Sequence, residues 1–430
     1  MKKSHKYKIL DSDLFKHQLV CYCSRFQNFC FLDSNLNKAN NDFDYLISFN
    51  VKNKFTYHKN IFQDLKYFIN EQKNQNWIFG FLTYDVKNYI ESLSSKNTDL
   101  QDFPIIHFFT AQVIVKVQDN TVTILFDYPW SSSKINDLFQ EIVNFSIPKI
   151  SIDKLKIHSR VNKKKYLDNI KLIKNKLQSG DIYEMNYCQE FYVENVQIDP
   201  YVLFNELNLI SNAPFTSFYK LNNHFCLCAS PERFFKKTGN KIISQPIKGT
   251  IKRINNVKLD QENKNYLLNN KKELSENVMI VDLVRNDLSK IAKKNSVNVE
   301  ELAALYTYKD VHHLISTISC QVDESKHIVD VIQALFPMGS MTGAPKLKSM
   351  ELIEKYEDTL RGLYSGTIGY IQPNGDCDFN VVIRSLLYNK QSKYLSFMVG
   401  GAITIDSDPE MEYQECLLKA KSIFKLLGKC

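Results

Sequence analysis

The stretch TSFYKLNNHFCLCA, residues 216–229, contains two apolar runs, Thr216–Leu221 and Phe225–Ala229, separated by a short polar segment. Runs of this length that are rich in β-branched and aromatic residues and bounded by Asn are typical of hairpin-paired strands. Similar runs follow in the last part of the chain: Thr367–Ile371, Asp378–Leu387 and Tyr394–Val399. Because the regular strand–helix–strand rhythm of a parallel sheet is absent, the sequence predicts an α+β fold built on large antiparallel sheets flanked by helices.

The first third of the chain has the same character. Its short strand-like runs are Phe29–Leu32, Trp77–Leu82, Ile105–Val117 and Val122–Phe126. The pattern loosens around residues 146–160, and we therefore predict two regions, residues 1–150 and 151–430. Two helices are expected in the second region: Asn162–Leu177, with Gly180 beyond its end, and Pro409–Leu427, with Asp408 as its N-cap.

Composition excludes several classes of protein. Hydrophobic residues make up 44% of the 430 residues, which is enough for a real core. The net charge of +8 is spread along the chain, so it favours solubility and an anionic substrate over nucleic-acid binding. The ten cysteines form no Cys-x-x-Cys pair and are expected to be small buried residues in a reducing compartment. No run is apolar enough for a secretory signal or a membrane span, so we expect a soluble, cytoplasmic protein.

One lysine has surroundings that suit a nucleophile. Lys248 stands in Pro246-Ile247-Lys248-Gly249-Thr250, and we expect a glycine turn that brings the backbone close to a ligand. The apolar pair Ile242-Ile243 precedes it, and burial there would lower the pKa of the amine and increase its neutral, attacking form. The alternative is an ordinary solvated lysine, since Lys and Arg total 55.

Carboxylates on two predicted helices suit a magnesium site. Glu276 lies in an apolar helix, where an unpaired charge is costly. Glu412, Glu415 and Lys419 share one face of the last helix by their spacing. Mg²⁺ prefers oxygen ligands of this kind, whereas zinc would favour His or Cys. For the second group, an ordinary surface salt bridge is the alternative.

Two glycine-rich segments and one arginine could hold anions. Gly339–Lys346 precedes a predicted helix, and the turn Gly400-Gly401-Ala402 could present N–H groups to a carboxylate. Arg384 interrupts an apolar run, and its planar guanidinium suits a carboxylate, although a structural salt bridge is also possible. Together these groups suit a small polycarboxylate substrate.

A set of ordered motifs spans about residues 160–427. They are Ser230–Phe234, Pro246–Thr250, Glu276–Asp287, His313–Ser316, Phe336–Lys346, Arg361–Tyr370 and Asp406–Glu415. In these motifs the chain resembles the chorismate-utilising enzymes, the family of anthranilate synthase component I. The resemblance implies that family's sandwich-like body, an N-terminal region over residues 1–150 and a chorismate-binding catalytic domain over residues 151–430.

The resemblance also implies roles by matched position. Lys248, Glu232 and His313 would be catalytic. Substrate would be bound by Gly249, Thr250, Tyr364, Arg384, Gly400, Gly401, Ala402 and Lys419. Glu276 and Glu415 would bind Mg²⁺. The chain departs from the family pattern at Glu184, where glutamine is usual, and at Met338, where glycine is usual; Glu184 could perturb the local charge.

Position 248 separates the activities within the family. The aminodeoxychorismate synthases resemble this chain in having Pro-Ile-Lys-Gly-Thr, whereas anthranilate synthases usually have alanine for the lysine. The resemblance therefore implies amination of chorismate at C4, through a Lys248 adduct at C2, to give 4-amino-4-deoxychorismate for 4-aminobenzoate and folate synthesis. The alternatives are an anthranilate or isochorismate synthase and a non-catalytic chorismate-binding homologue.

The source of ammonia is expected to be a partner. The Gly-x-Cys-x-Gly motif of a glutaminase nucleophile is absent from the sequence. The resemblance then implies a separate glutamine amidotransferase subunit, component II, that supplies ammonia.

Overall fold

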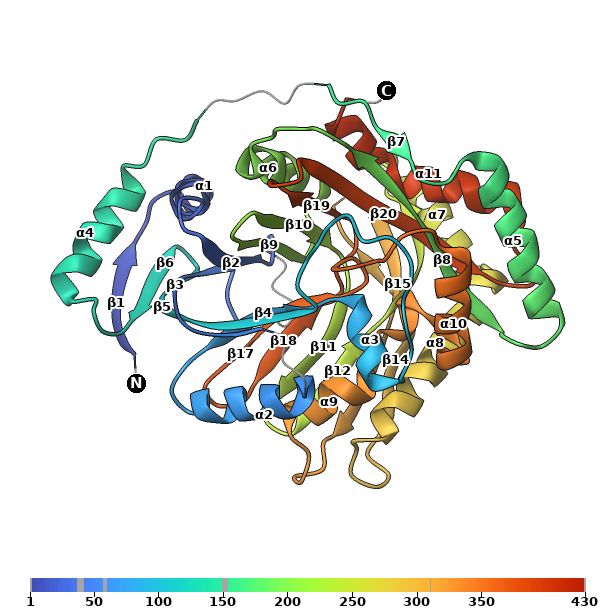
Figure 1. The fold of residues 1–430 in the computed structure, drawn as a ribbon, viewed down its shortest axis with the longest axis horizontal. Helices are drawn as coiled ribbons and strands as arrows, with labels where there is room; N and C mark the ends of the chain where they lie inside the picture. Colours follow the sequence, from blue (N-terminus) through green and yellow to red (C-terminus); the bar gives the residue numbers. More distant parts are fainter. Residues whose placement is uncertain (1, 37–41, 57–59, 149–153, 310, 429–430) are drawn as a thin grey trace.

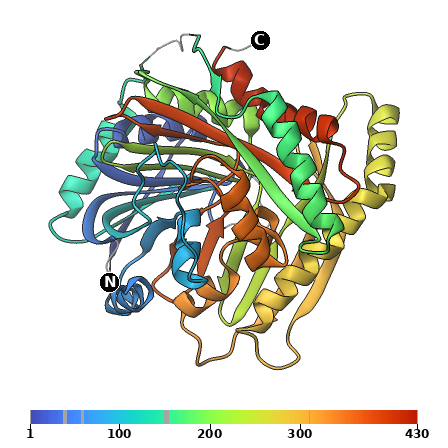
Figure 2. The same ribbon diagram turned by 45° about the vertical axis from the view of Figure 1, so that its right-hand side comes forward.

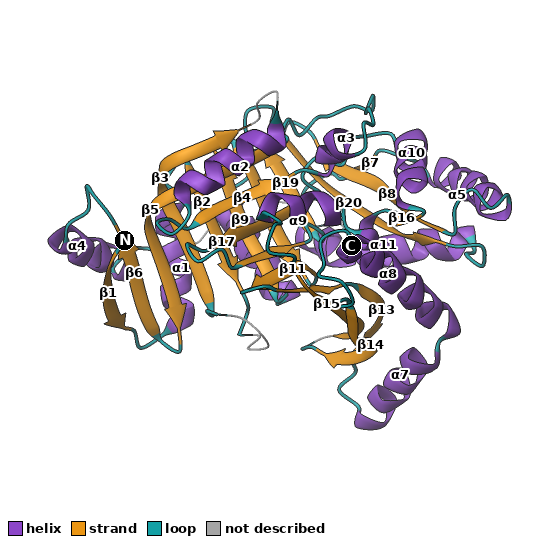
Figure 3. Cartoon of the chain, turned by 90° about the horizontal axis from the view of Figure 1, so that it is seen from below, coloured by secondary structure: helices purple, strands orange, loops and turns teal. Residues whose placement is uncertain are grey.

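The computed structural model describes residues 2–36, 42–56, 60–148, 154–309 and 311–428. The fold is α+β, with antiparallel strands in the middle and helices around them (Figures 1 and 3). The strands before residue 150 are β1 Lys3–Lys8, β2 Asn28–Asp33, β3 Tyr45–Thr56, β4 Ile78–Leu82, β5 Ile106–Gln118 and β6 Thr121–Phe126. The later strands are β7 His158–Ser159, β8 Glu184–Val193, β9 Phe215–Leu221, β10 His224–Ser230, β11 Arg233–Thr238, β12 Lys241–Gln245, β13 Ile247–Lys252, β14 Asn298–Thr307, β15 Val311–Gln321, β16 Gly343–Ala344, β17 Thr367–Ile371, β18 Cys377–Asn380, β19 Ser385–Asn389 and β20 Tyr394–Ile403.

Helices cover the outer faces of these strands. They are α1 Ser12–Cys23, α2 Ile61–Gln72, α3 Lys87–Ile90, α4 Ser132–Val143, α5 Lys163–Gln178, α6 Pro200–Ser211, α7 Val257–Asn269, α8 Lys271–Ser289, α9 Ile328–Leu335, α10 Lys346–Tyr356 and α11 Pro409–Leu426, with 3-10 turns η1 Tyr84–Val86 and η2 Gly339–Met341. The two helices expected from the sequence are present as α5 and α11. Asn162 and Asp408 cap them by accepting backbone N–H bonds, and Gly180 has a φ of +78° just beyond α5.

The predicted hairpin of residues 216–229 lies in the middle of a continuous sheet. β9 and β10 pair in antiparallel register, with Leu221 opposite His224, and β10 continues into β19 while β9 continues into β2. All of these pairings are antiparallel, so the predicted α+β fold class is confirmed.

Two predicted elements differ from the structure. The run Asp378–Leu387 is divided between β18 and β19, and Arg384 lies in the connection between them with a φ of +50°. The expected turn Gly400-Gly401-Ala402 is instead part of β20, where Gly400 lies opposite Cys188 of β8. A side chain at Gly400 would collide with the backbone of β8, since an added Cβ would be 2.2 Å from the Tyr187 carbonyl oxygen. Gly400 therefore serves close strand packing.

The sheet joins the two predicted regions. β2 pairs with β9, and β4 pairs with β17 so that Gly80 lies opposite Gly369. The predicted boundary between residues 150 and 151 lies outside the described residues, and the division there stays a prediction.

The two faces of the strands bury different side chains. Along β8, Met185, Tyr187 and Phe191 lie in one hydrophobic core, which α5 and α11 also enter. Cys188 belongs to a second core that includes Ile280 of α8. Because side chains alternate along a strand, Glu184 at the start of β8 shares the face of Cys188. Figure 2 shows α5 and α11 side by side over the first face.

The cysteine and membrane expectations can be checked on the described residues. All nine cysteines before residue 429 are free and buried, as expected for small core residues. Among the described helices, none is long and apolar enough to cross a membrane.

Candidate functional site

Lys248 lies in a strand rather than in the expected turn. It is the second residue of β13, which pairs with β15. The register slips between Ile247 and Thr250, so that Lys248 and Gly249 together oppose a single residue, Leu314. This is a β-bulge, a device that redirects a side chain. Gly249 has a φ of +88°, which an L residue with a side chain rarely adopts, so the glycine permits the bulge.

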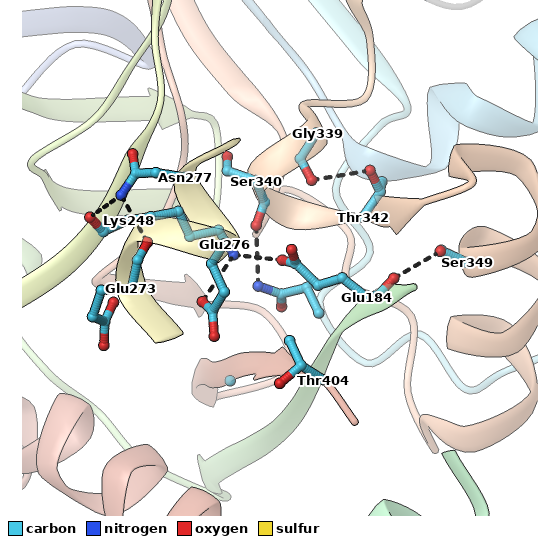
Figure 4. Close-up of polar contacts among 12 residues, drawn as sticks. Glu184, Lys248, Glu273, Glu276, Asn277, Gly339, Ser340, Thr342, Ser349 and Thr404 are labelled. Atoms are coloured by element: carbon cyan, nitrogen blue, oxygen red, sulfur yellow. Dashed lines mark hydrogen bonds and ion pairs between the residues drawn. The ribbon is translucent and has the colours of Figure 1, made fainter. Parts of the chain in front are cut away.

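The Lys248 amine is buried among carboxylates (Figure 4). Its Nζ donates to Oε1 of Glu184 at 2.6 Å and lies 3.9 Å from Oε2 of Glu276. The expectation of a lowered pKa is wrong. Burial lowers the pKa of Lys248, but the carboxylates of Glu184 and Glu276 outweigh it and raise the pKa above its usual range. The free protein therefore holds this lysine as an ammonium ion.

The N-terminal half of α8 supplies more charge to the same place. Glu276 is buried, as expected from its helix, and burial raises its pKa to about 7 against the opposing charge of Lys248. Glu273, one turn earlier, also has a raised pKa because of burial and the nearby Glu415 charge. An added Cβ at Gly249 would lie 3.2 Å from the Glu273 carboxylate, which places this end of α8 against the bulge.

Helix α11 closes the other side of the cluster. Glu412 is buried and accepts from Nζ of Lys272 at 2.9 Å, which links α8 to α11. Glu415 pairs with Lys419 at 2.8 Å, and that charge is the main cause of the lowered pKa of Glu415. An added Cβ at Gly401 would lie 3.4 Å from the Glu412 carboxylate, so the glycine leaves room beneath both glutamates. The three residues expected on one face do lie together.

The glutamates on α8 and α11 are suitable ligands for Mg²⁺, but they are not arranged as a complete metal site. Their acidic groups are all carboxylates, which Mg²⁺ prefers. Among the described residues, however, no three His, Cys, Asp or Glu side chains lie close enough to hold a metal ion. The Nζ of Lys272 lies between two of the glutamates, 2.9 Å from Glu412 and 3.9 Å from Glu276. A divalent cation at Glu276 and Glu415 would therefore compete with this ammonium.

Glu232 is close enough to Lys248 for their charges to interact. It follows β10 and is buried, and burial raises its pKa to about 7. The Ser340 hydroxyl donates to Glu232 Oε1 at 2.6 Å, and the charges of Lys248 and Arg384 also act on this carboxyl group. A carboxyl group with this pKa can both give and take a proton near neutrality.

Arg384 and His313 complete the polar surroundings of Glu232 and Lys248. The Arg384 guanidinium makes no hydrogen bond or ion pair with any residue that the structure describes. It thus has its donors free for a carboxylate. His313 Nδ1 lies 2.7 Å from the Thr250 hydroxyl, and burial with the nearby Arg384 charge lowers the His313 pKa to about 3. The imidazole is therefore neutral.

Tyr364 lies apart from the charged cluster. Its hydroxyl contacts Cys188 Sγ at 3.7 Å, on the strand that pairs with Gly400. Ala402 pairs with Asn186 on that same strand. The substrate-binding roles of Tyr364 and of residues 400–402 stay predictions. Met338 is buried in the core, so the departure at this position is accommodated by packing.

Sequence reasoning missed three members of the cluster. Glu273 stands three residues before Glu276 and so on the same helical face, and Lys272 stands four before it. This spacing alone could have indicated both. Glu184 was noted as a departure, but only the fold brings it to Lys248, 64 residues away in the chain.

The fold is antiparallel α+β, and the site places the buried Lys248 amine among carboxylates from α8 and β8. A family model for chorismate binding enzymes matches residues 28–425, and the chain belongs to this family. The structure resembles crystallised anthranilate synthase component I from Streptococcus pneumoniae, with a TM-score of 0.78, 23% identity and 92% of each chain covered.

Relatives with similar sequences carry more particular names. Aminodeoxychorismate synthase component 1 of Escherichia coli is 34% identical over 360 residues, which are 83% of this chain and 78% of that protein. A putative aminodeoxychorismate synthase of Schizosaccharomyces pombe is 40% identical over 268 residues, or 62% of this chain. The matched part spans only 37% of the length of the S. pombe protein.

Proposed function

We propose that this protein aminates chorismate at C4 with ammonia and releases 4-amino-4-deoxychorismate, a precursor of 4-aminobenzoate and folate. The observation that carries the proposal is the buried Lys248 amine, aimed by a bulge and hydrogen-bonded to Glu184 at 2.6 Å. The names of the relatives support the same reaction. The groups around Lys248 can accept its proton, protonate the leaving hydroxyl and hold a substrate carboxylate.

In the first half of the reaction, Lys248 becomes covalently attached to the ring. Its ammonium first gives a proton to Glu184, the acceptor already in contact with it. The neutral amine then forms a bond to C2 of chorismate, the two conjugated ring double bonds both shift towards C4, and the C4–oxygen bond breaks. Glu232, whose pKa is about 7, protonates the departing hydroxyl so that it leaves as water.

In the second half, ammonia attacks C4 and the lysine leaves. Both ring double bonds shift back, the C2–nitrogen bond breaks, and its electron pair returns to the Lys248 amine. Because C2 is occupied while ammonia attacks, amination is directed to C4. The free Arg384 guanidinium is suited to holding one of the two substrate carboxylates throughout.

We further propose that Glu276 and Glu415 bind Mg²⁺, with Glu273 and Glu412 beside them. The ion would supply positive charge that neutralises a substrate carboxylate. The same four glutamates would keep the substrate oriented over Lys248. Ammonia is proposed to come from a separate glutamine amidotransferase subunit.

The test is product identification after incubation with chorismate, Mg²⁺ and excess ammonium salt, with and without added aminodeoxychorismate lyase. We expect 4-aminobenzoate only when the lyase is present. Anthranilate formed without the lyase would assign the chain to C2 amination, and isochorismate would assign it to C2 hydroxylation. If the protein neither turns over nor binds chorismate, its role is non-catalytic.

The lysine is tested by a matched pair of variants on β13. Lys248→Ala should abolish C4 amination and shift residual product towards C2 amination, while Lys252→Ala, which removes an exposed lysine from the same strand, should leave the product unchanged. An unchanged rate and product in Lys248→Ala would contradict the covalent mechanism.

A further inference from the structure

The backbone at the Lys248 bulge is held by a side chain from outside the sheet. In β13 the pairing to β15 is interrupted between Ile247 and Thr250. Buried backbone carbonyls are almost always hydrogen-bonded. The Lys248 carbonyl accepts a hydrogen bond from Nδ2 of Asn277, at 2.9 Å, on α8 (Figure 4).

The orientation of the Asn277 amide is itself determined by a neighbour. The Ser316 hydroxyl donates to Asn277 Oδ1 at 3.1 Å, so the two donors of Nδ2 face the carbonyls of Lys248 and Glu273. Asn277 is 2% exposed and Ser316 is fully buried, which leaves bulk water out of this arrangement. Each buried polar atom of the amide thus has a partner.

Ser316 is held in turn by a second bulge. Between Glu301 and Ala304, β14 slips against β15 so that two residues oppose Ser316. One of them, Ala303, has a φ of +48° and donates its backbone N–H to the Ser316 hydroxyl at 2.9 Å. A hydroxyl can accept one bond and donate another, and this one does both.

We propose that Asn277 and Ser316 are positioning residues that hold the bulge at Lys248 and thereby aim the lysine amine at the substrate. The inference rests on the proposed function for its catalytic part. Bulges next to active sites redirect side chains, and this one is stabilised by an amide from α8, the helix that also carries Glu276. The strand of the nucleophile and the carboxylate helix are thus fixed to each other by one side chain.

The experiment compares Asn277→Ala and Ser316→Ala with Ser319→Ala. Ser319 is a matched control because it is on the same strand, 5% exposed, and donates to Glu300 at 2.7 Å without any link to Lys248. In Asn277→Ala and Ser316→Ala, amide hydrogen exchange over residues 247–252 should accelerate at least about tenfold. The kcat for C4 amination should fall about 10- to 100-fold with the chorismate KM nearly unchanged, since a small misplacement of a reacting group affects the rate.

The outcomes separate this inference from the proposed function. Unchanged exchange in both variants, or faster exchange with an unchanged kcat, would overturn the positioning role. Equal losses in Ser319→Ala would show a general effect on the sheet and would also overturn it. If the wild-type protein makes no amination product, the proposed function fails, and hydrogen exchange still decides whether Asn277 and Ser316 hold the bulge. Ser316→Ala removes a single oxygen atom and keeps the test available if Asn277→Ala does not fold.

Discussion

At the scale of single residues, the site is governed by charges that the fold buries together. The carboxylates of Glu184 and Glu276 raise the pKa of Lys248 against the effect of burial, while burial raises the pKa of Glu276 against the charge of Lys248. Burial alone would favour neutral groups, but the ion pair at 2.6 Å keeps the lysine charged. In the proposed mechanism, Lys248 must lose this proton before its amine can attack.

Glu184→Gln should lower the pKa of Lys248. The substitution keeps the size and an acceptor but removes the negative charge that raises this pKa against the effect of burial. An opposite charge at this distance is worth about 1–3 pKa units. The neutral amine should thus appear at lower pH in the variant. Acetylation of Lys248 by acetic anhydride, followed across pH by peptide mass spectrometry, measures this; an unmoved midpoint would contradict it.

Glu232→Gln should slow amination about 10²- to 10⁴-fold, because the amide cannot protonate the leaving hydroxyl. In the wild-type protein, burial raises the pKa of Glu232 to about 7, so the protonated form is lost as pH rises through that value. The kcat at saturating Mg²⁺ and chorismate should fall in the same range. The pH profile of kcat should lack this alkaline decrease in the variant. If the decrease occurs at the same pH in both proteins, it belongs to another group.

At the scale of elements, the site depends on how α8 lies against α11. Lys272 near the start of α8 reaches Glu412 of α11, and Glu276 and Glu415 face the same space. Each helix buries one face in the core, through Ile280 and Val284 on α8 and through Cys416 and Ala420 on α11. Apolar packing therefore sets the distance across which the carboxylates and a cation meet.

Lys272→Met should strengthen Mg²⁺ binding about tenfold or more. The substitution removes an ammonium that lies 2.9 Å from one carboxylate and 3.9 Å from another, and with it the competing positive charge. Calorimetric titration with MgCl₂ gives the affinity, and the rise of Tm with Mg²⁺ should also be larger than in the wild type. Lys271→Met, which removes an exposed neighbour, is the control. Equal affinities in all three proteins would contradict a metal site at these glutamates.

At the scale of the whole molecule, strands from the first 150 residues pair with strands from the later part of the chain. β2 lies beside β9 and β4 beside β17, and the second hydrophobic core combines Phe79 and Phe108 with Phe379. Removing the first strands would leave two sheet edges unpaired and open that core.

Residues 151–430 alone should not fold into a stable monomer. The missing strands β2 and β4 would expose the edges of β9 and β17 to water and to other chains. We expect aggregation or non-cooperative thermal unfolding by circular dichroism, where the full chain unfolds cooperatively. A cooperative, monomeric fragment would show that the predicted boundary at residue 150 separates independent domains.

Much of the fold was open to prediction from local pattern. Alternating apolar runs indicated β9, β10 and β17, and capping residues located α5 and α11 to within a residue or two. The predicted strand Asp378–Leu387 is interrupted by the connection that contains Arg384, and the predicted turn at Gly400 is part of β20. An apolar run predicts that its residues are buried, but it does not predict where the strand ends.

The sequence by itself determined the antiparallel α+β class, the family motifs and the identity of the chemical groups, because these depend on residue type and short spacing. Only the tertiary structure decided that Glu184 pairs with Lys248, that Lys272 lies between the glutamates, and that Asn277 donates to the Lys248 carbonyl. The physical reason is that the pKa of a buried group depends on the charges within a few ångströms of it, and those charges come from elements far apart in the chain.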